Sequence, residues 1–282
     1  MAGCNHDCGS CSQSCGKPNQ QTFLSLAEGT KIKHIVGVLS GKGGVGKSMV
    51  TSLLAVELAK KRYKVGILDS DITGPSIPKA FGLGYGVQGT ETLMFPPLSK
   101  LGIKIMSINL LVDNPMDPVL WRGPMFAGAI KSFYSETSWE ELDYLLIDMP
   151  PGTSDIALTV FTQIPMDGVF IVSTPQDLVK MIVGKAVTMC NKMNIDILGL
   201  VENMAYISCP DCGKKLYPFG PSKLDDVAKT FNIDAIASLP INPDYAYLVD
   251  TGNVEDIDTS FMLPAISKLE YIKWFYRSKR WN

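Results

Sequence analysis

The sequence predicts an α/β fold built on one doubly wound, mostly parallel sheet. Short apolar runs rich in β-branched residues alternate with stretches of helical periodicity. The runs are continuously apolar rather than alternating, as expected for strands covered by helices on both faces. The expected strands are residues 35–39, 65–68, 103–108, 144–147, 169–172, 198–201 and 237–239. The expected helices are residues 47–61, 154–163, 178–193, 223–231 and 263–276.

The composition bounds the domain organisation and the possible partners. A chain of 282 residues, 46% hydrophobic and 19% charged, is long enough for one α/β domain with a well-buried core. We expect that domain to span residues 30–282, behind a tail of residues 1–20 that has no large apolar side chain after Ala2. The apolar runs are too short to cross a bilayer, and the net charge of -2 offers no basic surface for nucleic acid. Because no export signal is recognisable, the expected location is cytoplasmic.

A glycine-rich segment follows the first expected strand and opens the first expected helix. It matches the G-x-x-x-x-G-K-[ST] phosphate-binding pattern in the strand–loop–helix context that the pattern requires. Its residues are Gly41, Lys42, Gly43, Gly44, Val45, Gly46, Lys47 and Ser48. The glycines let backbone N–H groups point at an anion at the helix N-terminus, Lys47 is expected to bind the β and γ phosphates, and the Ser48 hydroxyl to bind Mg²⁺. The sequence therefore predicts a P-loop nucleotide hydrolase.

Carboxylates end two further strands of the predicted sheet. Asp69 and Asp71 follow the second strand and Asp148 follows the fourth, at the carboxyl edge where open α/β sheets bind ligands. Asp148 is expected to be the Walker B carboxylate that holds Mg²⁺ through water, with Asp69 in the metal shell. Asp71 is the candidate for orienting the attacking water. The alternative for each aspartate is a helix cap or a turn.

The nucleotide is expected to be ATP. GTPases carry an N-K-x-D motif that reads guanine. The nearest match here, Asn191-Lys192-Met193-Asn194, lacks the aspartate and falls at an expected helix end. ATP is therefore favoured over GTP.

The seven cysteines are unevenly distributed, which favours metal binding over a disulfide framework. Cys209 and Cys212 form one C-x-x-C, which supplies only two of the roughly four protein ligands that zinc or a [4Fe-4S] cluster needs. A two-fold dimer would lend the same pair from its partner. Cys190 stands alone in an expected helix and is interpreted as a small buried hydrophobe. The tail has enough thiols for one complete cluster or zinc site, at Cys4, Cys8, Cys11 and Cys15.

Lys42 is a second lysine inside the phosphate loop, where the general pattern requires none. In this respect the loop resembles the MinD/ParA-like deviant Walker A ATPases, in which this lysine reaches the nucleotide of a partner subunit. The resemblance implies a nucleotide-sandwich homodimer in which Lys42 acts across the interface.

Several segments together are similar to the Mrp/ApbC iron–sulfur cluster carrier ATPases over residues 30–260. They are residues 41–48, 69–76, 121–124, 148–155 and 174–176, together with the C-x-x-C. The resemblance implies a homodimer that holds a labile [4Fe-4S] cluster between its two C-x-x-C pairs, hydrolyses ATP slowly and transfers the cluster to apoproteins. It also implies that Asn203, expected directly after the sixth strand, contacts adenine, and it favours a cluster over zinc in the tail.

Two other functions stay open at this point. The C-terminal stripe of Ala265, Leu269, Ile272 and Tyr276, with basic residues beside it, is compatible with a MinD-like membrane-cycling ATPase. We expect the stripe to pack on the sheet instead, without stable membrane binding. The other alternative is an ATP-gated electron-transfer protein resembling nitrogenase iron protein.

Overall fold

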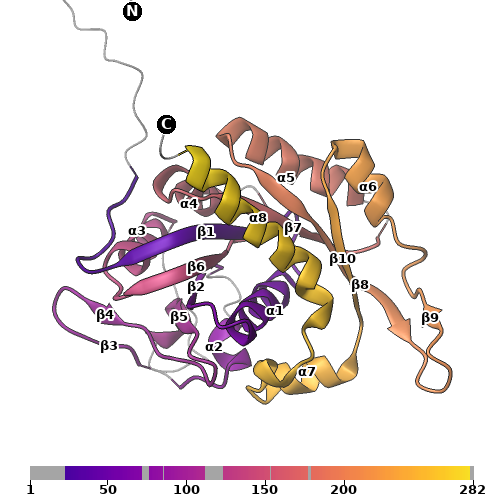
Figure 1. Cartoon of the computed structure of the whole chain (residues 1–282), viewed down its shortest axis with the longest axis horizontal. Coiled ribbons are helices and arrows are strands. Elements are labelled where there is room, and N and C mark those ends of the chain that lie inside the picture. The colour runs from indigo at the N-terminus through magenta and orange to yellow at the C-terminus, as the bar shows by residue number, and fades with distance from the viewer. Residues whose placement is uncertain are drawn as a thin grey trace, which may run out of the picture.

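The computed structural model describes residues 23–71, 76–84, 86–111, 123–152, 154–176 and 179–279. Within these residues, parallel strands form one sheet in the order β10-β8-β7-β1-β6-β2-β5 (Figure 1). The strands are β1 (Lys31–Ser40), β2 (Val65–Asp69), β5 (Lys104–Ser107), β6 (Glu141–Asp148), β7 (Gly168–Ser173), β8 (Ile197–Ser208) and β10 (Ala235–Pro240). The predicted doubly wound parallel sheet is confirmed, since the chain winds outward from β1 to both edges.

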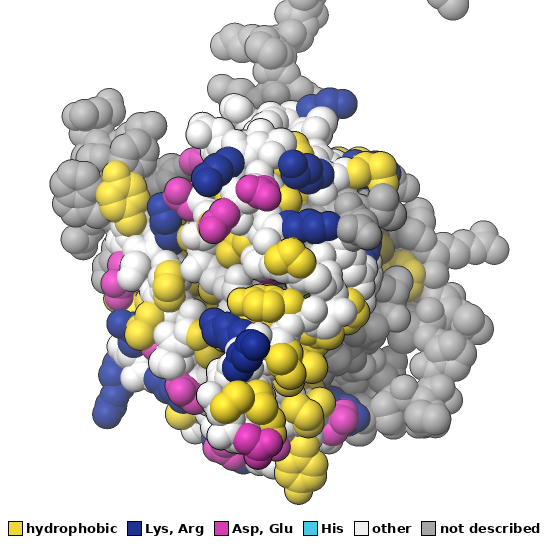
Figure 2. Space-filling model, turned by 90° about the vertical axis from the view of Figure 1, so that its right-hand side faces the viewer, with side chains coloured by type: hydrophobic (Ala, Val, Ile, Leu, Met, Phe, Trp, Pro, Cys, Tyr) yellow, Lys and Arg dark blue, Asp and Glu magenta, His cyan; other side chains and the backbone are white. Residues whose placement is uncertain are grey.

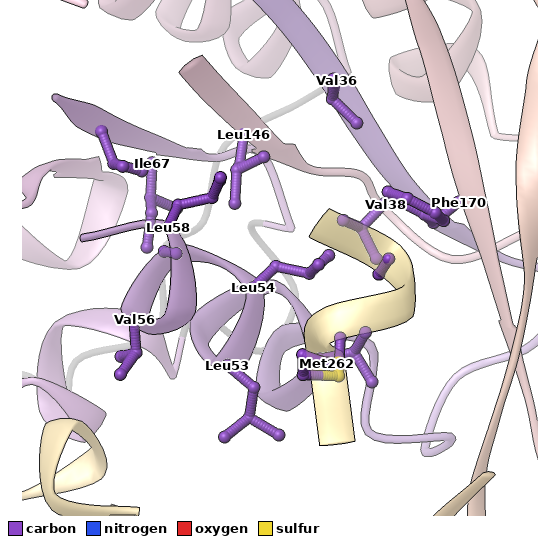
Figure 3. Close-up of a cluster of buried hydrophobic side chains, with 14 of the residues drawn as sticks. Val36, Val38, Leu53, Leu54, Val56, Leu58, Ile67, Leu146, Phe170 and Met262 are labelled. Carbon is purple, nitrogen blue, oxygen red and sulfur yellow. The ribbon is translucent and has the colours of Figure 1, made fainter. Parts of the chain in front are cut away.

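Helices cover both faces of this sheet. The α-helices are α1 (Lys47–Lys60), α2 (Ile77–Ala80), α3 (Gly123–Ser135), α4 (Asp155–Gln163), α5 (Val179–Met193), α6 (Leu224–Phe231), α7 (Pro243–Asp250) and α8 (Leu263–Lys279). Successive residues of β1 point to opposite faces, so Val36 and Val38 pack with α1 and α8, whereas Ile35 and Leu39 pack with α3, α4, α5 and α6. Figure 3 shows part of the face covered by α1 and α8, where Leu54 of α1 lies beneath the sheet. Burial on both faces explains why the strands read as unbroken apolar runs.

The apolar stripe of α8 belongs to the core. Ala265, Leu269 and Ile272 are buried in the same cluster as α1, and the Tyr63 hydroxyl donates to Glu270 Oε1 at 2.9 Å. The expectation that this stripe packs on the sheet is confirmed for these three residues, while the Tyr276 side chain lies outside the described part. None of the described helices is long and apolar enough to cross a membrane.

The structure differs from the sequence prediction mainly in short or weakly patterned elements. The helices α2, α3 and α7 were not predicted, and neither were the 3₁₀ helices η1 (Ile108–Leu110), η2 (Val254–Asp256) and η3 (Ser260–Met262) or the short strands β3 (Gln88–Gly89), β4 (Met94–Phe95) and β9 (Lys215–Leu216). α2 is a single turn, and α7 buries no residue, so no apolar stripe marks it. α3 begins at Gly123-Pro124, which reads as a turn signal.

Candidate functional site

The phosphate loop joins β1 to α1 with the backbone geometry that anion binding requires. Gly44 and Gly46 both have φ of 76°, and Gly46 is the N-cap of α1. No side chain caps this helix, so its first N–H groups face the loop without a capping acceptor. Gly41 is required for another reason, because a Cβ there would lie 2.4 Å from the carbonyl oxygen of Ile182 in α5. A cavity of about 370 Å³ opens over the loop, lined by Ser40, Gly43, Gly44, Gly46, Lys47, Ser48, Met49, Ser52, Asp71, Ser76, Ala80, Pro151 and Val249.

Lys47 lies at the centre of a buried polar cluster. Its Nζ is 2.8 Å from Asp148 Oδ1 and 3.2 Å from Asp71 Oδ2. Burial alone would lower the pKa of Lys47, but the negative charges of Asp148 and Asp71 outweigh this effect and raise it. The ammonium is therefore held charged, as a phosphate ligand must be. The structure brings together Lys47, Asp71 and Asp148, three of the residues that the sequence predicts for the nucleotide site.

Asp148 also binds two hydroxyl groups of α1. Ser48 Oγ donates to Asp148 Oδ2 at 2.6 Å, and Thr51 Oγ1 donates to Asp148 Oδ1 at 2.8 Å. Sequence reasoning missed Thr51. The available signal was its spacing, four residues after Lys47, which places both side chains on the same face of α1. A hydroxyl and a carboxylate oxygen in contact form the donor set that Mg²⁺ prefers.

Asp69 lies beside Asp148 at the end of the neighbouring strand, in direct register with it. Its carboxylate is fully buried and accepts hydrogen bonds from Ser107 Oγ at 2.9 Å and from the Asp71 N–H at 3.1 Å. Burial, followed by the nearby charge of Asp148, raises the pKa of Asp69 well above its usual value. The neutral form of Asp69 is therefore favoured more than that of an exposed aspartate.

Lys42 points away from this cluster. Its Nζ donates to the side-chain oxygen of Gln176, a partner 134 positions later in the chain. The Ser40 hydroxyl donates to the Lys42 carbonyl at 2.9 Å and shapes the loop locally. The two lysines of the loop therefore have separate environments. Lys47 is buried among carboxylates and Lys42 lies at the surface.

Asn203 reaches the phosphate loop from the middle of β8. Its Nδ2 donates to the Val45 carbonyl at 2.9 Å, and a Cβ at Gly46 would lie 2.1 Å from the same nitrogen. The prediction that Asn203 directly follows a strand is wrong, because β8 continues to Ser208 through pairing with β10 and β9. A second cavity of about 260 Å³ adjoins the loop here, lined by Gly46, Met49, Leu53, Asn203, Met204, Leu239, Pro240, Ile241, Asn242, Tyr245, Ala246 and Val249.

Cys209 and Cys212 lie at the tip of a hairpin formed by β8 and β9. The Cys209 N–H donates to the Lys214 carbonyl at 3.0 Å, and the Gly213 N–H donates to the Cys209 carbonyl at 2.9 Å. Cys212 is exposed and Cys209 half-buried. Hydrogen bonds from the backbone N–H groups of Cys212 and Asp211, and from the Cys212 thiol, lower the pKa of Cys209.

Two thiols supply only half of the protein ligands that a four-coordinate metal or cluster site needs. Among the described residues, no group of three or more Cys, His, Asp or Glu side chains is placed to hold a metal ion. The four tail cysteines, Cys4, Cys8, Cys11 and Cys15, lie outside the described part of the chain. Cys190 is fully buried, and burial raises its pKa to about 12, which confirms its interpretation as a small core residue.

Comparison with known proteins agrees with this geometry. A family model described as ParA, NUBPL iron-transfer P-loop NTPase, matches residues 31–269. The chain belongs to this family. It is 51% identical over 233 residues to the iron-sulfur cluster carrier protein of Clostridium perfringens, covering 80% of this chain and 82% of that protein. It is 43% identical over 249 residues to the cytosolic Fe-S cluster assembly factor NUBP2 homolog of Culex quinquefasciatus, covering 84% of this chain and 97% of that protein.

A solved structure supports the same assignment. The nucleotide-binding protein of Archaeoglobus fulgidus, solved in complex with ADP, is 46% identical and superimposes with a TM-score of 0.72, covering 80% of this chain and 89% of that chain. As a member of this family, the chain is a P-loop NTPase. The resemblance read from the sequence motifs is confirmed at the level of the family.

Proposed function

We propose that this chain is an ATP-dependent iron–sulfur cluster carrier. Two subunits hold one [4Fe-4S] cluster between their Cys209 and Cys212 pairs and transfer it to apoproteins, with slow ATP hydrolysis. The observation that carries the proposal is the presence, in one chain, of a complete phosphate site and an exposed hairpin that presents only two thiols. The similarity to proteins named iron-sulfur cluster carriers supports it.

In the nucleotide site, the residues have distinct proposed roles. The phosphate-binding residues are Gly41, Lys42, Gly43, Gly44, Val45, Gly46, Lys47 and Ser48. Lys47 neutralises the phosphates of its own subunit, and the Ser48 hydroxyl with Asp148 and Asp69 forms the Mg²⁺ site. Mg²⁺ bound there would neutralise charge on the phosphates. Asp71, whose carboxylate is 3.2 Å from Lys47, orients the attacking water.

The second cavity is the proposed adenine site. It adjoins Gly46 and has mainly apolar walls, which suit the flat face of a base, while Asn203 supplies an amide near the loop. The absence of an N-K-x-D guanine reader at residues 191–194 agrees with ATP.

Lys42 and the hairpin both argue for a homodimer. Lys42 lies at the surface, held by Gln176, from where it serves the nucleotide of the partner subunit in the proposed assembly. The two hairpin thiols are too few for a cluster site, and a second subunit related by two-fold symmetry would supply the other two. Hydrophobic side chains gather over the face of the molecule that carries the hairpin, among them Ile207, Leu216, Tyr217 and Phe219 (Figure 2). Such a surface suits burial against a second subunit or a client apoprotein.

The remaining expectations form part of the proposal. Residues 30–282 act as one ATPase domain with the cysteine segment, residues 204–220, as an insertion in it. The tail cysteines, Cys4, Cys8, Cys11 and Cys15, form a separate cluster or zinc site. Cytoplasmic location is part of the proposal, and the cytosolic naming of the Culex quinquefasciatus relative supports it. Nucleic acid and membranes are not among the proposed partners.

The test is anaerobic reconstitution with iron and sulfide, followed by transfer to an apoprotein acceptor. We expect one bridging cluster per dimer. Replacing both Cys209 and Cys212 with alanine should abolish that cluster and its transfer while ATP binding and the fold persist, because neither thiol contacts the phosphate loop. A matched control replaces the four tail cysteines and should keep the bridging cluster.

Two results would overturn the carrier proposal. The first is cluster transfer by the double variant at the wild-type rate. The second is tightly bound zinc at the hairpin of protein purified without oxygen, since a closed zinc site is structural.

A further inference from the structure

A single strand connects the two proposed sites. β8 runs from the interior of the sheet, where Asn203 contacts the phosphate loop, out to the hairpin where Cys209 follows the last strand residue (Figure 1). Asn203 and Cys209 are therefore separated by only five residues of the chain. A displacement of β8 near Asn203 can therefore move Cys209 through only a few intervening residues.

β8 carries a bulge at this point. Glu202 pairs with Ser238 and Tyr206 pairs with Pro240, so four residue steps in β8 oppose two in β10. Within the bulge, Met204 has φ of 56°, a left-handed conformation that is disfavoured for a residue with a side chain. Backbone in such sparsely populated regions is held in place by its surroundings and occurs often at switch segments. The strand is thus irregular where it passes the nucleotide site.

The bulge is in contact with that site. The amide of Asn203 is bonded to Val45, and a Cβ built on Gly46 would lie 3.8 Å from Met204 Cε. Asn203 and Met204 also line the cavity that adjoins the loop. A molecule that fills this cavity meets both residues.

Glu202, the residue before the bulge, holds the segment that leads from the hairpin back to α6. Glu202 is buried, and its carboxylate accepts hydrogen bonds from Ser222 Oγ at 2.5 Å and from the Lys223 N–H at 3.1 Å. Ser222 and Lys223 are the residues by which the chain returns from the hairpin into α6. Neighbouring residues of β8 therefore hold both the phosphate loop and the return segment of the cysteine hairpin.

We propose that the bulge at Asn203–Met204 couples the nucleotide site to the cysteine hairpin, with Glu202 as the positioning residue. Nucleotide in the cavity favours one conformation of the bulge. Through β8 and the Glu202–Ser222 contact, this conformation changes the accessibility of Cys209 and Cys212. The cargo that this coupling regulates is that of the proposed carrier function, but the coupling itself needs no cluster. Because coupling is reciprocal, occupation of the thiols changes nucleotide affinity by the same factor.

The test uses cluster-free, reduced protein and measures alkylation of each thiol by mass spectrometry, with and without Mg·ADP or a non-hydrolysable ATP analogue. In the wild type, nucleotide should slow alkylation of Cys209 and Cys212 about fivefold, at the lower end of known coupling strengths. Glu202→Gln and Ser222→Ala should keep nucleotide affinity within about twofold yet reduce this effect to less than about twofold. Thr230→Ala is the matched control. It removes an exposed hydroxyl of α6 that donates to the backbone carbonyl of Asp226 in the same helix, and it should respond like the wild type.

Equal alkylation rates with and without nucleotide in the wild type would overturn the proposal. A full nucleotide response in both Glu202→Gln and Ser222→Ala would also overturn it. If the protection that remains in these variants is lost with Lys42→Ala, the protection comes from a partner subunit and not from the bulge. Ser222 is exposed, so its variant is expected to fold even if Glu202→Gln does not. Failure to reconstitute a cluster would refute the carrier function and leave this result standing.

Discussion

Replacing Gly46 with alanine is expected to destabilise the fold more than the same change at Gly44. Both residues have φ of +76°, a conformation that costs a residue with a side chain roughly 1–2 kcal/mol. Their surroundings differ, because a Cβ at Gly46 would lie 2.1 Å from Asn203 Nδ2, whereas nothing lies within 4 Å of a Cβ at Gly44. Overpacking costs about 1–3 kcal/mol, so the totals should be about 2–5 kcal/mol for Gly46→Ala and about 1–2 kcal/mol for Gly44→Ala.

Urea unfolding of the nucleotide-free protein measures both losses as changes in the free energy of unfolding. Asn203→Ala removes the amide that a Cβ at position 46 would meet, so in this background the steric part of the Gly46→Ala loss should disappear. The double-mutant cycle should then show a coupling of about 1 kcal/mol or more. Equal losses for the two glycine variants, or additive effects of Gly46→Ala and Asn203→Ala, would refute the close approach of Asn203 as the reason for a glycine at this position.

Three further predictions follow from the site. Lys47→Ala should abolish ATP binding, because its ammonium is buried within the phosphate cavity, whereas Lys42→Ala should keep most binding and lose hydrolysis; equal ATPase rates for wild type and Lys42→Ala would contradict the cross-subunit role. Anionic liposomes should not co-sediment the protein with or without ATP, since Ala265, Leu269 and Ile272 of the α8 stripe are buried. ATP-dependent sedimentation that requires residues 263–282 would favour the membrane-cycling alternative. Alkylation of Cys209 should rise with pH through a midpoint lower than that of the same thiol in the unfolded chain, because its hydrogen bonds stabilise the thiolate and lower its folded-state pKa. Unfolding in urea should raise the midpoint of Cys209 alkylation. An unchanged midpoint would show that the folded hairpin does not lower the pKa of Cys209.

The sheet could be predicted from the sequence because its strands are buried on both faces. A segment such as 169–172 has no polar residue to interrupt it, and Gly168–Ser173 is buried throughout in the structure. The same reasoning fails for α7, whose residues are all at least partly exposed, so helical periodicity is absent from its pattern. It also fails for the end of β8, because the length of that strand depends on pairing with β9 and β10 rather than on its own residues.

The site could be predicted where a motif lies in one continuous segment. Lys47 and Ser48 were found because the loop and helix that hold them are consecutive, and Asp148 because it ends an apolar strand. Contacts between distant segments carry no such local signal. The bond between Lys42 and Gln176, and that between Glu202 and Ser222, depend on how β8 and the loops after β1 and β7 are brought together by the fold.

The place of the cysteine hairpin outside the core also bears on its proposed use. Neither Cys209 nor Cys212 belongs to the two buried clusters that hold the helices on the sheet. Segments with few buried apolar contacts open at little cost in free energy, so in the proposed carrier we expect loading or emptying the hairpin to leave the stability of the P-loop core nearly unchanged. A structural zinc site behaves in the opposite way, because its metal supplies much of the folding free energy of the domain. A cargo that must leave requires the first arrangement, and a hairpin outside both buried clusters would provide it.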